Sequence, residues 1–376
     1  MARLSRSIAA CAAAAALLGT SACGDDEASG TDSASSSSAA SNGAVSDAKT
    51  AFEEFSQAPG PIELPAVGKP IPKADVTVLY PPTPGIEAIV GGVKAGAAEL
   101  GWNVKEVAPD VSPEAFASAL DSIVEQGPDA LIFLTPFPLD SYDKQLRGLK
   151  ADGIPVVAVG ATGYPVGGDS PVVASSGLDN VFGPLAELEA QTMISHAGGG
   201  PKMALVVDPS VPAWQTIIDN MRRTIEAAGG EYNQVDVALA ELAKAPERVV
   251  SFLQSHPDVE YLWLTINAFN VGLPQALRSA GLADKVVIGT GAGDQSDVEG
   301  IENGSLYATV AIETASNGWR LVDATARALA GASLDCCTKI SGKYLIVTEG
   351  NLELASDISA FPDQPDAFRK AWGLAG

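Results

Sequence analysis

Cysteine is the residue type with the clearest chemistry in this sequence, and its four copies fall in two regions. Cys11 and Cys23 lie near the N-terminus, where two arginines precede a run of small and apolar residues that leads to Thr20-Ser21-Ala22-Cys23. This order predicts a secretory signal over residues 1–22, with Cys23 as the first mature residue and the site of lipidation. The apolar run is shorter than the roughly 20 residues of a membrane-spanning helix.

The other two cysteines, Cys336 and Cys337, are adjacent. Consecutive Cα atoms lie about 3.8 Å apart, which is shorter than the usual disulfide span. Because few other partners exist in an oxidising compartment, we favour a structural disulfide between them, and two free thiols in a loop are the alternative. No C-x-x-C pair is present, so neither a zinc ribbon nor a thioredoxin-type redox site is predicted, and we expect no metal site and no cofactor.

Patterns for covalent catalysis are weak. His196 and His256 are expected in a helix and at a helix end, which argues against a metal site or a catalytic triad. The sequence has no G-x-S-x-G elbow, and Gly289–Gly293 lacks the spacing of a dinucleotide loop. Asp179 and Glu313 would be the carboxylates for acid–base chemistry, but we interpret Asp179 as a hinge or capping residue and Glu313 as a hinge or ligand contact. We therefore expect a protein that is not an enzyme.

Charge and composition restrict the partners and the domain number. The net charge of −23 argues against nucleic acid and against anionic membrane surfaces as partners. The roughly 350 residues that follow the signal suit two domains. Residues 24–50 are mainly Ser, Ala, Gly and acidic residues, which predicts a flexible tether. Five prolines in residues 58–73 predict an extended lead-in.

From Val76 onward the sequence alternates between apolar strands and helically spaced segments. In the first half we expect strands at 76–80, 102–107, 130–134 and 155–159, and helices at 86–100, 116–124 and 140–152. In the second half we expect strands at 203–207 and 261–264, and helices at 212–228 and 246–255. The repeated order predicts two similar Rossmann-like α/β lobes with parallel sheets. A closed barrel fits less well, because it would have no break at the midpoint.

Open parallel sheets bind ligands at the carboxyl ends of their strands. In this sequence the loops at those ends are 81–85, 135–140, 160–168, 208–214, 265–270 and 290–294. Two lobes that face each other across these loops would form a cleft for a ligand.

Several ordered motifs carry a family resemblance. They are Asp129–Ile132 leading into Thr135-Pro136-Phe137, Ala151–Val157, Asp179-Asn180, Ala280-Gly281 with Val286–Gly289, and Tyr307–Glu313. With these motifs the chain resembles the type I periplasmic solute-binding proteins of ABC transporters, in particular the ribose and sugar-binding branch, over about residues 73–350. The resemblance implies one small solute bound between two lobes, and a closed form that an ABC permease recognises.

The resemblance also implies a domain plan with three hinge crossings, the first at Asp179 and Asn180. Lobe 1 would comprise 73–178 and about 314–335, and lobe 2 would comprise 179–313 and about 340–350. Residues 23–72 would form the lipidated tether, and 351–376 a C-terminal extension. We expect an extracytoplasmic monomer that is held at the membrane only by its lipid.

Ligand contacts follow from the same resemblance, residue by residue. The candidates are Tyr80, Phe137, Trp214, Asn267, Phe269, Asp294 and Glu313. Trp214 is the strongest of them, because it follows Pro212-Ala213 in a loop rather than in an apolar run.

At three positions the sequence departs from the sugar-binding pattern, so the resemblance does not decide the chemical class of the solute. Trp214 replaces an arginine, and Ala268 and Gly291 replace acids. A site built for hydroxyl groups loses about 1–3 kcal/mol for each buried group left unpaired, whereas aromatic rings suit an aromatic or alicyclic solute. A sugar and an apolar, ring-containing solute are therefore both retained. The alternative function is a sensor that presents its closed form to a membrane signalling receptor.

Overall fold

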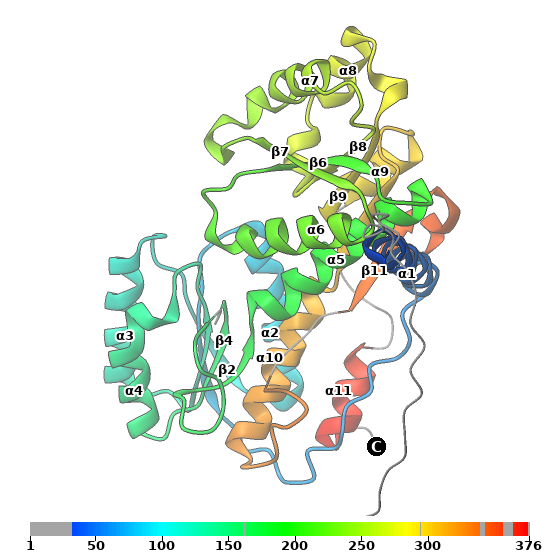
Figure 1. Ribbon diagram of the computed structural model, residues 1–376. Helices are drawn as coiled ribbons and strands as arrows, with labels where there is room; N and C mark the ends of the chain where they lie inside the picture. Colours follow the sequence, from blue (N-terminus) through cyan, green and yellow to red (C-terminus); the bar gives the residue numbers. More distant parts are fainter. Residues whose placement is uncertain (1–31, 161–162, 294, 339–342, 356–363, 375–376) are drawn as a thin grey trace, which may run out of the picture. The chain divides into compact units, whose positions relative to one another are not determined.

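The computed structural model describes residues 32–160, 163–293, 295–338, 343–355 and 364–374. The predicted signal, Cys23 and Asp294 lie outside these ranges. Within them the chain forms two α/β lobes, each built on a mainly parallel sheet with helices on both faces (Figure 1). The predicted fold class is thereby confirmed.

The sheet of lobe 1 has five parallel strands in the order β2-β1-β3-β4-β5. These strands are β1 (Asp75–Leu79), β2 (Asn103–Val107), β3 (Ala130–Leu134), β4 (Val156–Val159) and β5 (Val172–Ser176). One face is covered by α2 (Pro84–Leu100) and α10 (Thr314–Leu329), and the other by α3 (Pro113–Gln126), η1 (Leu139–Tyr142) and α4 (Asp143–Ala151). All five residues of β3 are buried, as expected for a parallel strand covered on both faces.

Helices α2 and α10 approach each other closely at Gly318. A Cβ atom at this position would lie 2.2 Å from the carbonyl oxygen of Ile89 and 2.5 Å from the amide nitrogen of Val93. Only glycine permits this backbone contact, which fixes α10 on lobe 1.

The sheet of lobe 2 has six strands in the order β11-β10-β9-β8-β6-β7, and only the pair β10–β11 is antiparallel. The strands are β6 (Lys202–Val207), β7 (Glu231–Asp236), β8 (Tyr261–Leu264), β9 (Val287–Ala292), β10 (Ala308–Ile312) and β11 (Tyr344–Thr348). Helices α5 (Leu178–Ala197) and α6 (Gln215–Ala227) cover one face. The other face is covered by α7 (Ala245–Ser255), α8 (Leu273–Ala280), α9 (Gln295–Glu302) and η6 (Glu349–Ala355).

Short 3-10 turns follow three strands of lobe 2, and they are η2 (Pro212–Trp214), η3 (Leu239–Lys244) and η4 (Asn267–Asn270). A fourth, η5 (Ala283–Lys285), lies between α8 and β9. Two of them, η2 and η4, carry residues predicted to contact a ligand.

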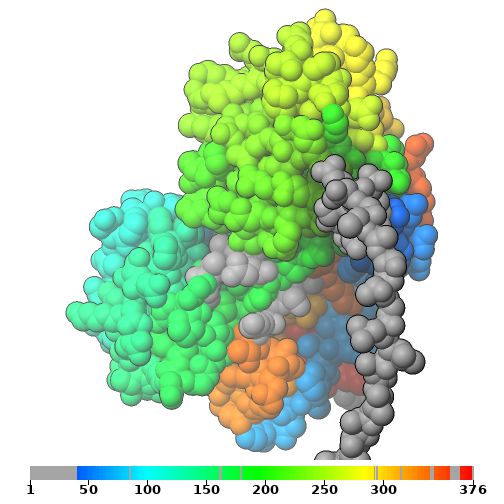
Figure 2. All heavy atoms as spheres, in the orientation of Figure 1, coloured from blue at the N-terminus to red at the C-terminus, as the bar shows by residue number. Residues whose placement is uncertain are grey.

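The chain passes between the lobes from β5 to α5, from β10 to α10, and from α10 to β11. It also makes two passes that are not predicted from the sequence. The N-terminal segment runs from lobe 2 to Ile62 and Val67 in the core of lobe 1, and α11 (Gln364–Trp372) returns to that core after β11. Figure 2 shows the end of α10 (orange) beside the lead-in segment (blue), where Lys69 donates to the carbonyl of Gly331.

The tether prediction is wrong for the described part of residues 24–50, because α1 spans Asp32–Phe55. Val45, Ala48, Phe52 and Phe55 follow a helical spacing of three and four, and they pack against the apolar core of lobe 2. In Figure 1 the helix lies beside β11. Tertiary packing stabilises a sequence whose composition alone does not favour a helix.

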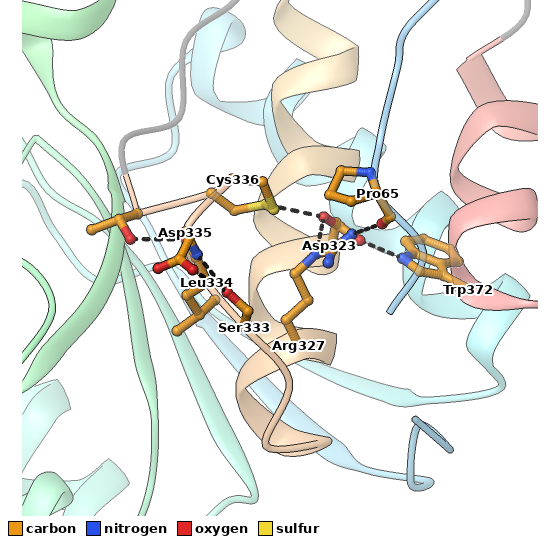
Figure 3. The surroundings of a disulfide bond; sticks show 10 residues. Pro65, Asp323, Arg327, Ser333, Leu334, Asp335, Cys336 and Trp372 are labelled. Atoms are coloured by element: carbon orange, nitrogen blue, oxygen red, sulfur yellow. Dashed lines mark hydrogen bonds and ion pairs between the residues drawn. A yellow bond between two sulfur atoms is a disulfide. The ribbon is translucent and has the colours of Figure 1, made fainter. Parts of the chain in front are cut away.

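Asp323 of α10 belongs to a polar cluster that connects the lead-in segment and α11 to lobe 1 (Figure 3). Its carboxylate accepts hydrogen bonds from Arg327 Nε and Trp372 Nε1, each at 2.8 Å, and Arg327 also donates to the carbonyl of Pro65. Cys336 and Cys337 form a disulfide, and the sulfur of Cys337 lies 3.5 Å from the Asp323 carboxylate. The lead-in, α10 and α11 are therefore held together by one buried polar cluster.

Candidate functional site

The carboxyl ends of β6, β8 and β9 are neighbours in the sheet of lobe 2. The turns that follow them therefore lie side by side. Trp214 in η2 and Phe269 in η4 pack edge to face, with ring centroids 6.4 Å apart and an interplanar angle of 67°. Phe269 is fully buried, whereas Trp214 is half-buried and packs on apolar residues of both faces of the lobe. Of this pair, Trp214 is the ring that can contact a ligand.

Asn267 provides a polar group beside this aromatic pair. Its Nδ2 donates to Ser296 Oγ at 2.6 Å, which joins the turn after β8 to the first turn of α9. Asp294, also a candidate, lies outside the described residues.

Asp208, which is not among the predicted site residues, positions the loop that leads to Trp214. Its carboxylate accepts from Ser210 N at 2.9 Å, Ser210 Oγ at 2.6 Å and Leu239 N at 2.7 Å. Hydrogen bonds from Ser210 and from the Leu239 backbone lower the pKa of Asp208. An Asp followed by Pro-Ser at a strand end is a recognisable Asx-turn signal that would have identified it.

Glu313 lies at the crossing from β10 to α10 and is 1% exposed. Its Oε1 accepts from Arg320 Nε at 2.8 Å and lies 2.7 Å from Arg320 Nη2. Nearby, Asn317 Nδ2 donates to Ser176 Oγ at 3.2 Å, so the start of α10 is bonded to the end of β5. These contacts join Glu313 to α10 and the start of α10 to β5, and the role of Glu313 as a hinge residue or a ligand contact stays a prediction.

The predicted hinge residues Asp179 and Asn180 occupy the first turn of α5, directly after the first crossing. The backbone N–H of Asn180 donates to the carbonyl oxygen of Gly177 at 3.0 Å. The structure thus places both at the junction of the lobes.

In lobe 1, Tyr80 follows β1 and packs with its apolar core. Its hydroxyl donates to Glu106 Oε2 at 3.0 Å, and Glu106 also pairs with Lys94 at 2.7 Å. Burial, reinforced by Glu106, raises the pKa of Tyr80. This tyrosine has a partner within its own lobe.

Phe137, the second aromatic candidate of lobe 1, packs on the opposite face of the same sheet. Its ring lies edge to face on Phe116 with centroids 5.6 Å apart. Among the described side chains, no ring contact joins Tyr80 or Phe137 to the pair Trp214–Phe269.

A second residue outside the predictions is Glu189 of α5, which is 1% exposed and lies beside Gly291 of β9. Burial raises its pKa well above the usual range, and the Trp263 indole offsets this only in part. The signal in the sequence was an acid on the apolar face of a helix, between Leu188 and Ala190.

Four cavities among the described residues are lined by other residues than these candidates. One cavity, of 610 Å³, is at the amino ends of β9 and β10 and is lined by residues that include His196, Arg278 and Tyr307. The helices that the structure describes include none with the length and apolar character needed to cross a membrane.

Comparison with known proteins identifies the fold family. The model of the periplasmic binding protein domain matches residues 76–333. The xylitol-binding protein of Mycolicibacterium smegmatis is 26% identical over 231 residues, and the chain spans 59% of the length of this curated relative, with 59% of its own residues aligned.

Solved structures share the architecture at low identity. A periplasmic ribose ABC transporter protein from Conexibacter woesei superposes with a TM-score of 0.66 at 18% identity, covering 77% of this chain and 96% of its own. The XylFII-LytSN complex contains a chain that superposes with a TM-score of 0.59 at 20% identity, covering 74% of this chain and 100% of its own. These likenesses show the type I fold.

Proposed function

Because the chain belongs to the family of periplasmic binding protein domains, we propose that it is an extracytoplasmic lipoprotein that captures a small solute between its lobes and delivers it to an ABC permease. The family consists of solute-binding proteins rather than enzymes. A solute that touches both lobes binds the closed arrangement better, so it shifts the hinge equilibrium by its differential affinity. The permease would then recognise the closed form.

The proposed solute is a sugar or a sugar alcohol. The observation that carries this proposal is the grouping of Trp214 with Asn267 and Ser296 at the carboxyl edge of lobe 2. One ring face beside hydrogen-bonding side chains suits a ligand with apolar C–H faces and hydroxyl edges. The xylitol-binding relative supports the same class of solute.

An apolar ring compound is less well supported by the contacts. It would need a wall of several rings, but Tyr80 and Phe137 pack within lobe 1, and Phe269 is fully buried. Of the four aromatic candidates, Trp214 and Phe137 keep partly exposed rings but lie in different lobes, whereas Tyr80 and Phe269 are buried.

A calorimetric screen tests the solute class. Xylitol, D-ribose, D-allose and D-galactose are titrated into the chain that begins after residue 23, and benzoate and cyclohexanol serve as ring-containing comparisons. We expect heat of binding and a raised melting temperature with at least one sugar or polyol. Binding of the ring compounds without any sugar or polyol would overturn the proposal.

The lipid anchor is a separate part of the proposal and has its own test. The wild-type chain should incorporate labelled fatty acid and sediment with membranes, whereas Cys23→Ser should be released unlabelled. Cys11→Ser is the matched control and should behave as wild type. Equal labelling of Cys23→Ser and wild type would remove the anchor from the proposed function.

A sensor that presents its closed form to a membrane signalling receptor is the second candidate. The fold shared with a chain of the XylFII-LytSN complex favours it, because that protein is found in a complex with another protein. Solute uptake by cells that lack this chain separates the two: lost uptake supports transport, and unchanged uptake with a lost transcriptional response supports sensing.

A further inference from the structure

Glu189 is a buried carboxylic acid that the proposed binding mechanism has not yet used. It lies on the face of α5 that packs on the lobe 2 sheet, between Leu188, which is 3% exposed, and Ala190, which is fully buried. Among the described residues, neither its Oε2 nor the nearby Trp263 Nε1 has a partner at hydrogen-bond geometry, although the indole lies close enough to the carboxyl group to offset part of its raised pKa. A buried polar atom without a partner costs about 1–3 kcal/mol, so its presence calls for a reason.

Position 291 explains how this carboxyl group comes to the edge of the sheet. A Cβ atom on Gly291 would lie 2.2 Å from Glu189 Oε1 and 3.1 Å from the carbonyl oxygen of Thr265. Any side chain at 291 would therefore occupy the space that the Glu189 carboxyl fills. Because residue 291 of β9 is a glycine, the carboxyl group of Glu189 on α5 can lie directly against this strand.

The location connects Glu189 to the candidate site. Gly291 is the last but one residue of β9, and Thr265 is the first residue after β8. The turn that begins there carries Asn267 and Phe269, and Phe269 packs on Trp214. The Glu189 carboxyl thus lies against the backbone from which the site residues of lobe 2 extend.

We propose that Glu189 is a solute contact, whose carboxyl group reaches the carboxyl edge of the lobe 2 sheet through the space at Gly291 and pairs with a hydroxyl group of a sugar or sugar alcohol. This assignment rests on the proposed function. A carboxyl group in its protonated form offers one O–H donor and one carbonyl acceptor, so it can both donate to and accept from a hydroxyl group. Its raised pKa agrees with that form at neutral pH.

Substitution of Glu189 tests the contact by calorimetry with the sugar or polyol that binds wild type best. Glu189→Leu should weaken binding by about tenfold or more, since it removes both hydrogen-bonding atoms. Glu189→Gln, which keeps a donor and an acceptor, should stay within about threefold of wild type. Glu187 is exposed on the same helix, and Glu187→Leu is the matched control with unchanged affinity.

Infrared difference spectroscopy gives a second readout, which holds even if Glu189→Leu fails to fold. Adding the solute to wild type should shift the carbonyl stretching band of a protonated carboxyl group, and this shift should be absent in Glu189→Gln. A purely structural acid would give no such shift.

The outcomes separate this inference from the proposed function. A wild-type protein that binds no sugar or polyol overturns the proposed function, and the assignment falls with it. If wild type binds, then unchanged affinity in a folded Glu189→Leu, or an unshifted carbonyl band, overturns the role of Glu189 alone. A loss of affinity confined to Glu189→Leu, together with a solute-dependent band, supports it.

Discussion

The indole of Trp214 packs edge to face on the Phe269 ring, although the two residues follow different strands of the lobe 2 sheet. Because Phe269 is fully buried, it acts as a fixed support for the half-buried indole. The pair therefore combines a packing residue with a residue able to contact solute, which leads to two different predictions.

Trp214→Ala should weaken solute binding by about tenfold or more, because burying a large ring against a ligand contributes roughly 1.5–3 kcal/mol. Calorimetry with the best-binding sugar or polyol measures the change. Trp214→Phe keeps an aromatic face and should retain most of the affinity. Equal affinities for wild type and Trp214→Ala would assign this residue to packing alone.

Phe269→Ala should instead lower the free energy of unfolding by about 3–5 kcal/mol, as expected for a fully buried phenylalanine. Urea denaturation followed by circular dichroism measures this loss. Val271, which is 75% exposed two residues later, provides the control, and Val271→Ala should leave the midpoint unchanged. A similar midpoint for both variants would contradict the supporting role.

Glu189 should make stability fall as pH rises. The unfolded carboxyl titrates near pH 4.5, whereas burial holds the proton on the folded one to a higher pH. Between these values the folded state binds more protons than the unfolded state, so its stabilisation is full below pH 4.5 and is lost as pH rises through the folded pKa.

Glu189→Gln should remove this slope, and unfolding free energies of both proteins from pH 4 to 8 measure the difference. Tyr344 of β11 interacts with both Glu189 and Glu313, but burial raises its own pKa, so it stays neutral in this range. Parallel pH profiles for the two proteins would show that Glu189 is ionised when folded.

The Asp323–Arg327 ion pair should be important for stability, since both side chains are no more than 3% exposed. Arg327→Met leaves the Asp323 carboxylate buried beside the Trp372 indole and should cost about 3–5 kcal/mol. Differential scanning calorimetry measures the fall in melting temperature. Arg147, whose side chain is 64% exposed in a surface pair with Asp143, provides the control Arg147→Met, and equal effects of the two would contradict the prediction.

Helix α1 should depend on its contact with lobe 2. Ala48→Asp places a charge at a fully buried position and should release the helix, which limited proteolysis detects as new cleavage within residues 40–55. Lys49→Asp, at the neighbouring exposed position, should leave the protease pattern unchanged. If the wild type were cleaved at the same rate as Ala48→Asp, residues 40–55 would be flexible, as a tether would be, and the helix would not be packed on lobe 2.

The repeating order of strands and helices could be predicted from the sequence because its signals are local. The apolar run of β3 and the helical spacing of α2, ended by Gly101 with a positive φ of 62°, both appear where expected. The motifs from Asp129 to Phe137 and from Tyr307 to Glu313 also sufficed for the family, since the family model matches the region that contains them. Each of these signals depends on residues close together in the chain.

Only the tertiary structure decided where individual side chains of the site point. The Tyr80 hydroxyl donates a hydrogen bond to Glu106, and Arg320 donates one to Glu313. The carboxyl group of Glu189 fills the space beside Gly291. These partners lie on different elements or in different turns, so composition and spacing do not reveal them. The same reason explains α1, whose weak local preference for a helix is overcome by the apolar surface that it buries on lobe 2.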